Sequence, residues 1–178
     1  MLLERLGLEF ETCSPEIDET RREGEAAEDL AARLAGQKAR AVARDKPTAI
    51  VIGSDQVAIC RGQIIGKPGS VSHAIGQLQG FSGKSVQFLT AISVICVETQ
   101  FRQDHTTSTD VCFRELSEAE IERYVNIDQP LDCAGSFKSE RAGISLLKSM
   151  TSDDPTAIIG LPLIALSQAL REAGFQLP

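Results

Sequence analysis

Apolar residues recur at two different spacings along the chain, and the two spacings predict helices and strands. Residues 26–44 place Leu30 and Leu34 four apart among alanines, which predicts an amphipathic helix. Ser117 is followed three residues later by Glu120, the pattern of a capping box at a helix start. Further predicted helices are 2–6, 72–79 ended by Gly80, 117–125 and 161–173.

Strands are predicted where apolar or β-branched residues form continuous or alternating runs. The run 48–59 is followed by Arg61-Gly62, a turn signal, and by 63–65 as a return strand. The other predicted strands are 10–13, 85–98, 105–116 and 144–150. Because crossovers and hairpins are mixed along the chain, the expected class is α/β with a mixed sheet.

Composition narrows the class of protein. The chain has 178 residues, the size of one domain, and a formal net charge of −7. A net acidic chain argues against non-specific nucleic-acid binding, which needs a basic face. We also expect no membrane association and a cytoplasmic location, because the chain has no apolar run of about 18 residues and no signal-peptide pattern at its N-terminus.

Cysteine and histidine offer little material for a site. The five cysteines contain no C-x-x-C pair, which argues against a disulfide framework or a thiolate zinc site. Only two histidines are present, so a histidine-based metal site is also disfavoured.

The first candidate for chemistry is Asp55, which follows an apolar run, 50–52, and the small residues Gly53 and Ser54. A buried strand that delivers a carboxylate to a sheet edge is a common arrangement in α/β enzymes, and Lys67 follows on the return strand. The alternative is that Asp55 only caps a turn. Two phosphate-loop patterns fail, because Leu78 stands where a glycine is required and Pro68 where Ser or Thr is required.

Other polar residues share loop-like or helix-end positions. Loop carboxylates bind Mg²⁺ through oxygen, and lysines neutralise phosphate charge that grows in a transition state. This combination fits a nucleotide phosphohydrolase. The alternative role for Lys38 and Lys138 is that of an exposed surface charge. The alternative for Glu16 and Asp18 is that they are solvated acids of a loop. The set is Glu16, Asp18, Glu19, Lys38, Asp55, Gln56, Lys67, Lys138 and Glu140.

Seven motifs occur in the order found in Maf proteins, which are nucleoside triphosphate pyrophosphatases related in fold to inosine triphosphatase. They are Ser14-Pro15-Glu16-Ile17-Asp18-Glu19-Thr20, Leu34 to Ala39, Gly53-Ser54-Asp55-Gln56-Val57, Gly66-Lys67-Pro68, Ser82-Gly83, Ala134 to Glu140 and Ile159-Gly160-Leu161-Pro162. The resemblance implies one domain over residues 1–178, a twisted mixed sheet with flanking helices, and two lobes around a cleft.

The resemblance also implies roles for individual residues. Asp55 matches the proton acceptor that activates water, and Glu19 with Asp55 matches the ligands of a divalent cation, Mg²⁺ or Mn²⁺. Lys38 and Lys67 match lysines of the phosphate site. The implied partner is a nucleoside triphosphate, and the family suggests a homodimer.

Gln56 and Glu140 resemble the specificity positions of the branch that hydrolyses 7-methyl-GTP, rather than the dTTP and UTP branch. A carboxylate accepts hydrogen bonds from guanine N1–H and N2–H₂, and N7 methylation adds positive charge that an anion favours. The implied reaction yields 7-methyl-GMP and pyrophosphate and removes a modified nucleotide from the pool.

The chain departs from the family pattern at its start. Family members begin with a strand and a Ser-x-Ser-Pro-x-Arg-Arg turn, an anion site at a helix N-terminus, whereas this chain begins inside the following helix. A misassigned start and a true truncation at the N-terminal strand are both open. Two alternative functions therefore stay open: a pyrophosphatase for dTTP, UTP or other nucleotides, and a catalytically impaired nucleotide-binding protein linked to septum formation.

Overall fold

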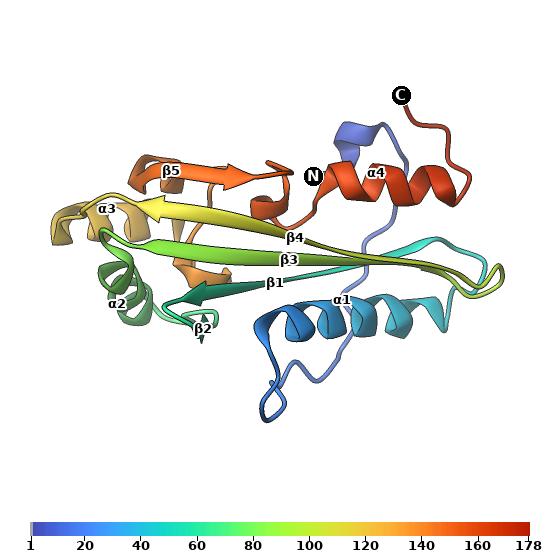
Figure 1. The fold of residues 1–178 in the computed structure, drawn as a ribbon, viewed down its shortest axis with the longest axis horizontal. Coiled ribbons are helices and arrows are strands. Elements are labelled where there is room, and N and C mark those ends of the chain that lie inside the picture. Colours follow the sequence, from blue (N-terminus) through green and yellow to red (C-terminus); the bar gives the residue numbers. More distant parts are fainter. Residues whose placement is uncertain (1) are drawn as a thin grey trace.

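Five antiparallel strands form the sheet of the computed structural model, which describes residues 2–178. The strands lie side by side in the order β2-β1-β3-β4-β5, and every pairing is antiparallel (Figure 1). The strands are β1 Val51–Cys60, β2 Gln63–Ile65, β3 Ser85–Cys96, β4 Phe101–Phe113 and β5 Leu147–Ser152. The α/β class is confirmed, but the sheet is antiparallel throughout rather than mixed, because neighbouring strands run in opposite directions at every pairing. The two lobes and their cleft stay a prediction.

The four α-helices lie at the two ends of the long strands. In Figure 1, α1 and α4 lie toward one end of the β3–β4 hairpin, and α2 and α3 toward the other. They are α1 Ala27–Ala43, α2 Val71–Phe81, α3 Glu118–Asp128 and α4 Leu163–Glu172. Short 3₁₀ helices are η1 Leu3–Leu6, η2 Ala134–Ser136, η3 Ala142–Leu146 and η4 Ala157–Ile159.

The capping box predicted for α3 is confirmed, because Ser117 and Glu120 bond reciprocally. The strand predicted for 10–13 is wrong: those residues have no regular structure. The strand predicted for 144–150 begins later, at Leu147, because 3₁₀ turns occupy the residues before it. Gly80 does not end α2, which continues to Phe81 because that ring packs into the core.

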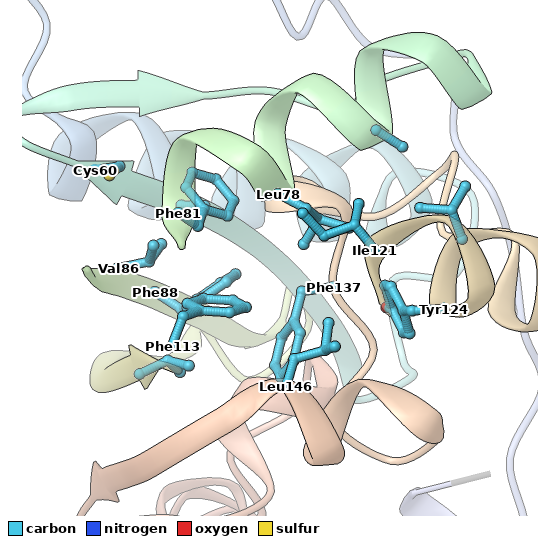
Figure 2. Packing of buried hydrophobic residues seen from close by; sticks show 14 of the residues in the cluster. Cys60, Leu78, Phe81, Val86, Phe88, Phe113, Ile121, Tyr124, Phe137 and Leu146 are labelled. Carbon is cyan, nitrogen blue, oxygen red and sulfur yellow. The ribbon is translucent and has the colours of Figure 1, made fainter. Parts of the chain in front are cut away.

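The two faces of β1 pack against different helices. Ala58 and Cys60 belong to the largest core cluster, with α2, α3 and Phe137, whereas Val57 packs against Leu30 and Leu34 of α1. Figure 2 shows the larger cluster, in which Phe81, Phe88, Phe113 and Phe137 gather between the sheet and the helices. Successive β1 residues therefore point to different environments, as a pleated strand requires.

Gly53 lets α1 lie directly on β1. A Cβ at this position would lie 2.6 Å from the amide nitrogen of Ala39 and would also collide with the carbonyl oxygen of Ala35. Only a residue without a side chain permits this approach. The contact brings the middle of α1 against the strand two residues before Asp55.

One edge of β1 is open over most of its length. β2 pairs only with Ala58, Ile59 and Cys60, so within residues 2–178 the stretch 51–57 has a strand partner on the β3 side alone. A groove of ≈ 1040 Å³ runs beside this stretch and is lined in part by Leu3, Phe10, Cys13, Ile52 and Ser54. The groove separates β1 from the irregular segment that follows η1.

No helix among the described residues is long and apolar enough to cross a membrane.

Candidate active site

Asp55 lies at the centre of a cluster of four charged side chains on the α1 face of β1. The Nζ of Lys38 lies 2.5 Å from Oδ1 of Asp55 and 2.9 Å from Oε1 of Glu19. Lys67 Nζ lies 3.7 Å from the other oxygen of Glu19. Four residues predicted from the sequence therefore converge in space. Asp55 lies inside β1, paired with Ala91, rather than at a strand end or a turn, and Lys67 lies beyond the return strand β2 rather than on it.

Burial and charge shift the pKa values of these groups. Burial raises the pKa of Asp55 above its ordinary value, and the hydrogen bond from Lys38 only partly offsets this effect. Burial alone would lower the pKa of Lys38, but its bonds to Asp55 and Glu19 outweigh burial and raise it. The Lys38 bond lowers the pKa of Glu19. Asp55 is thus a stronger proton acceptor than an ordinary aspartate, beside a lysine that stays charged.

An arginine clamp fixes the loop that carries Glu19. Arg33 of α1 donates to both carboxylate oxygens of Glu25, at 2.5 and 2.9 Å, and to the carbonyl of Thr20 at 3.0 Å. A bidentate arginine–carboxylate pair has a defined geometry. Because Thr20 follows Glu19 directly, the clamp sets where Glu19 lies. Sequence reasoning missed Arg33 and Glu25, since their pairing spans a loop of irregular structure.

Two further acids predicted from the sequence, Glu16 and Asp18, are exposed. Oδ1 of Asp18 accepts a hydrogen bond from the backbone of Thr20 at 2.9 Å and so shapes the turn. Within residues 2–178, no cluster of three or more histidine, cysteine, aspartate or glutamate side chains is close enough to bind a metal ion.

Gln56 points to the opposite face of β1 from Asp55. Its Nε2 lies 2.8 Å from Oγ1 of Thr90 and 3.1 Å from the carbonyl oxygens of both Ala157 and Ile158. These bonds attach η4 to the sheet. Gln56 therefore holds η4 against the sheet, and its predicted role in substrate specificity stays a prediction.

Ser54 strengthens the same attachment. Its hydroxyl lies 2.9 Å from the carbonyl of Ala91 and 2.7 Å from that of Gly160. A hydroxyl has one proton, so the two carbonyls share it. Together with Gln56, this bond holds the 157–160 segment over the β1 face that α1 does not cover.

The segment that carries Glu140 lies on this second face. Gly135 approaches Ala58, since a Cβ on the glycine would lie 3.3 Å from that of the alanine. Glu140 is exposed and is not brought into contact with Asp55. The segment is held to α3 by the hydroxyl of Tyr124, which accepts a bond from the backbone of Lys138 at 3.0 Å.

Lys138 acts at the end of a helix rather than at the charged cluster. Its Nζ lies 3.4 Å from the carbonyl of Asp128, the last residue of α3, and 3.5 Å from that of Gln129, the C-cap residue. A lysine in this position satisfies unpaired carbonyls and interacts favourably with the helix dipole. The alternative of a free surface charge is therefore wrong for Lys138.

Known proteins resemble this chain over nearly its whole length. The profile of the family described as Maf-like protein matches residues 1–173. A protein of Aromatoleum aromaticum named 7-methyl-GTP pyrophosphatase is 56% identical over 178 residues, which are 100% of this chain and 92% of that protein.

Two further relatives carry the same name. One from Albidiferax ferrireducens is 51% identical over 175 residues, covering 98% of this chain and 88% of the relative. One from Xanthomonas oryzae is 55% identical over 178 residues, covering 99% and 92%. These matches confirm the resemblance that the seven motifs indicated.

Proposed function

We propose, since this chain belongs to the Maf-like protein family, that it is a nucleotide pyrophosphatase that hydrolyses 7-methyl-GTP to 7-methyl-GMP and pyrophosphate. The observation that carries the proposal is the contact of Asp55 and Glu19 with one ammonium group, that of Lys38, with Lys67 beside them. Two lysines and two carboxylates on one face provide both phosphate recognition and proton transfer.

In the proposed reaction, water attacks the α-phosphorus and Asp55 accepts its proton. The bond between the α-phosphorus and the bridging oxygen breaks, and pyrophosphate leaves with the bonding electrons. Lys38 and Lys67 neutralise the charge that grows on the phosphate oxygens. The raised pKa of Asp55, caused by burial, suits a general base better than an ordinary aspartate.

A divalent cation, Mg²⁺ or Mn²⁺, fits this donor set only as a partner of the substrate. Two carboxylates are present, Glu19 and Asp55, and Mg²⁺ is commonly bound through one or two carboxylates together with substrate phosphates and water. When bound, the cation would supply further neutralisation of phosphate charge. Lys38 already contacts both carboxylates, so nucleotide binding must rearrange this contact.

The pleat of β1 supports a proposal for where the base binds. Because Asp55 and Gln56 point to opposite faces, a nucleotide whose phosphates lie at Asp55 reaches the Glu140 segment by crossing the strand edge. That edge is open over residues 51–57. We propose that Gln56 and Glu140 select the base there, with the Glu140 carboxylate accepting from guanine N1–H and N2–H₂.

The test is pyrophosphate release with Mg²⁺ from 7-methyl-GTP, GTP, dTTP, UTP and ITP. Asp55→Ala is compared with Asp110→Ala, which removes an exposed aspartate of β4. We expect turnover of 7-methyl-GTP that is lost in Asp55→Ala and kept in Asp110→Ala. Preference for dTTP or UTP would assign the chain to the dTTP and UTP branch of the family. Tight nucleotide binding without turnover would favour the alternative of a catalytically impaired nucleotide-binding protein. A cytoplasmic location and a homodimer stay predictions.

A further inference from the structure

Gln77 of α2 contacts two segments that are far apart in the sequence. Its Nε2 lies 3.2 Å from the carbonyl oxygen of Gly66, and its Oε1 lies 2.6 Å from Oγ of Ser136. Gly66 directly precedes Lys67, and Ser136 lies four residues before Glu140. The side-chain amide of Gln77 therefore links the residue before Lys67 to the segment that carries Glu140.

The Gly66 side has no regular structure of its own. Residues 66–69 follow β2 and are held by contacts to their surroundings: the backbone of Gly69 donates to Leu131 at 3.0 Å, and the ring of His73 lies 3.2 Å from the carbonyl of Pro68. Both anchors lie beyond Lys67. Before Lys67, the pairing of Ile65 with Ala58 anchors the end of β2, and Gln77 adds a side-chain bond at Gly66 itself.

The Ser136 side is under backbone strain. Ser136 has φ 54° and Gly135 has φ 67°, so two successive residues adopt left-handed conformations, and Ser136 is fully buried. A residue other than glycine keeps such a conformation only where its surroundings hold it. The short bond to Gln77 is such a restraint.

We infer that Gln77 is a positioning residue that fixes Lys67 relative to the Ser136–Glu140 segment. It thereby couples recognition of the phosphates to recognition of the base. The inference rests on the proposed function for its substrate. It does not require Gln77 to touch the nucleotide, because the residue acts through the two segments that it joins.

The chemistry requires an amide. The carbonyl of Gly66 needs a donor and the hydroxyl of Ser136 needs an acceptor, and a glutamine supplies both. An ionised glutamate keeps the acceptor but turns an oxygen toward the Gly66 carbonyl. Gln77→Glu therefore breaks one half of the bridge. Gln79→Glu introduces the same charge at an exposed position of the same helix and is the matched control.

The first experiment measures KM and kcat for 7-methyl-GTP and the inhibition constant of inorganic tripolyphosphate, which has no base. In Gln77→Glu we expect KM to rise by about three- to tenfold, the loss expected for one hydrogen bond. We expect the tripolyphosphate constant to change by less than about twofold, because each end of the site is intact by itself. An equal rise in both constants, or the same rise in Gln79→Glu, would overturn the coupling.

The second experiment uses Ser136→Ala, which breaks the bridge from its other side. If the two bonds act as one bridge, the double variant loses less activity than the product of the two single losses. Losses that multiply would show two independent contacts.

Amide hydrogen exchange gives a readout that does not depend on the substrate. Exchange should accelerate in 66–69 in Gln77→Glu, which loses the bond to Gly66, and in 134–140 in Ser136→Ala, which loses the other bond. It should accelerate in neither segment in Gln79→Glu. If the unaltered protein proves inactive on 7-methyl-GTP, the proposed function fails, but exchange still decides the bridge. Unchanged exchange in either segment would overturn it.

Discussion

The ammonium of Lys38 and the carboxylate of Asp55 lie 2.5 Å apart, and their side chains are 23% and 12% exposed. Glu19 contacts the same ammonium at 2.9 Å. A charged pair this sheltered is costly to break from one side, because the remaining charge loses its partner. Loss of Lys38 would therefore leave two neighbouring carboxylates, Asp55 and Glu19, without their shared partner.

Lys38→Met should remove a phosphate contact and the partner of Asp55 at once. We expect kcat/KM for 7-methyl-GTP to fall by about 10²- to 10³-fold, the loss typical of a charge-stabilising donor. The control is Lys148→Met, which alters an exposed lysine of β5 and should leave kcat/KM unchanged. A loss below about threefold in Lys38→Met would remove Lys38 from the phosphate site.

The dependence of kcat/KM on pH should report Asp55. Burial raises its pKa above the ordinary value of 3.8, so the acidic limb of the profile should lie above pH 3.8. In Lys38→Met the limb should move to still higher pH, because the Lys38 bond is the main influence that lowers this pKa. A limb that does not move in that variant would assign it to another group.

Gly53→Ala should separate α1 from β1. The added Cβ collides with backbone atoms of Ala35 and Ala39, which cannot rotate away. We expect a loss of about 1–3 kcal/mol in the free energy of unfolding, as for overpacking, and a loss of activity as Lys38 moves from Asp55. Urea unfolding measures the first and pyrophosphate release the second.

Gly80→Ala is the control for that substitution. Its added Cβ meets nothing within 4 Å and lies inside α2. Alanine is favoured over glycine in a helix by about 1 kcal/mol, so this variant should be more stable. If both variants changed stability in the same direction, the steric explanation for Gly53 would fail.

Acid should weaken the start of α3. Bonds from the backbone and hydroxyl of Ser117, and then from Arg114, lower the pKa of Glu120 from 4.5 to about 2. A lowered pKa in the folded state stabilises the fold above pH 4.5, and this contribution is lost as pH falls toward 2. The stability difference between the unaltered protein and Glu120→Ala, measured by urea unfolding, should therefore shrink over that interval. Glu118→Ala, which alters an exposed acid of the same turn, should show a much smaller change.

Glu140→Gln tests selection of the base. The amide can still accept from guanine but carries no charge for the N7-methylated ring, so the preference for 7-methyl-GTP over GTP should fall. A drop of about tenfold in the ratio of kcat/KM values corresponds to about 1.4 kcal/mol. Glu122→Gln, on the exposed side of α3, is the control, and an unchanged ratio in Glu140→Gln would exclude this residue from base selection.

Sequence patterns predicted the elements whose signals are local. The capping box of α3, the turn at Arg61-Gly62 and the long β3–β4 hairpin all depend on neighbouring residues, and all are present. The strand predicted for 10–13 fails because a strand needs a partner, and no residue of that short run signals whether one exists.

The candidate site could be assembled from sequence only through its motifs. Spacing alone does not show that Glu19 and Lys38 meet Asp55, because the loop and helix that carry them are placed by tertiary packing. Arg33 and Gln77 carried no signal at all, since each acts on residues distant in sequence. By contrast, the opposite directions of Asp55 and Gln56 follow from the strand pleat and were open to prediction.

The open edge of β1 also bears on how the protein behaves in concentrated solution. Unpaired backbone groups along an apolar strand are a template for joining a strand of another molecule, the first step of aggregation. The stretch 51–57 has apolar side chains at Val51, Ile52 and Val57 and contains neither lysine nor proline, the residues that commonly protect such edges. Loss of activity on storage would then begin at the strand that carries Asp55, so the yield of active protein should fall faster than its helix content.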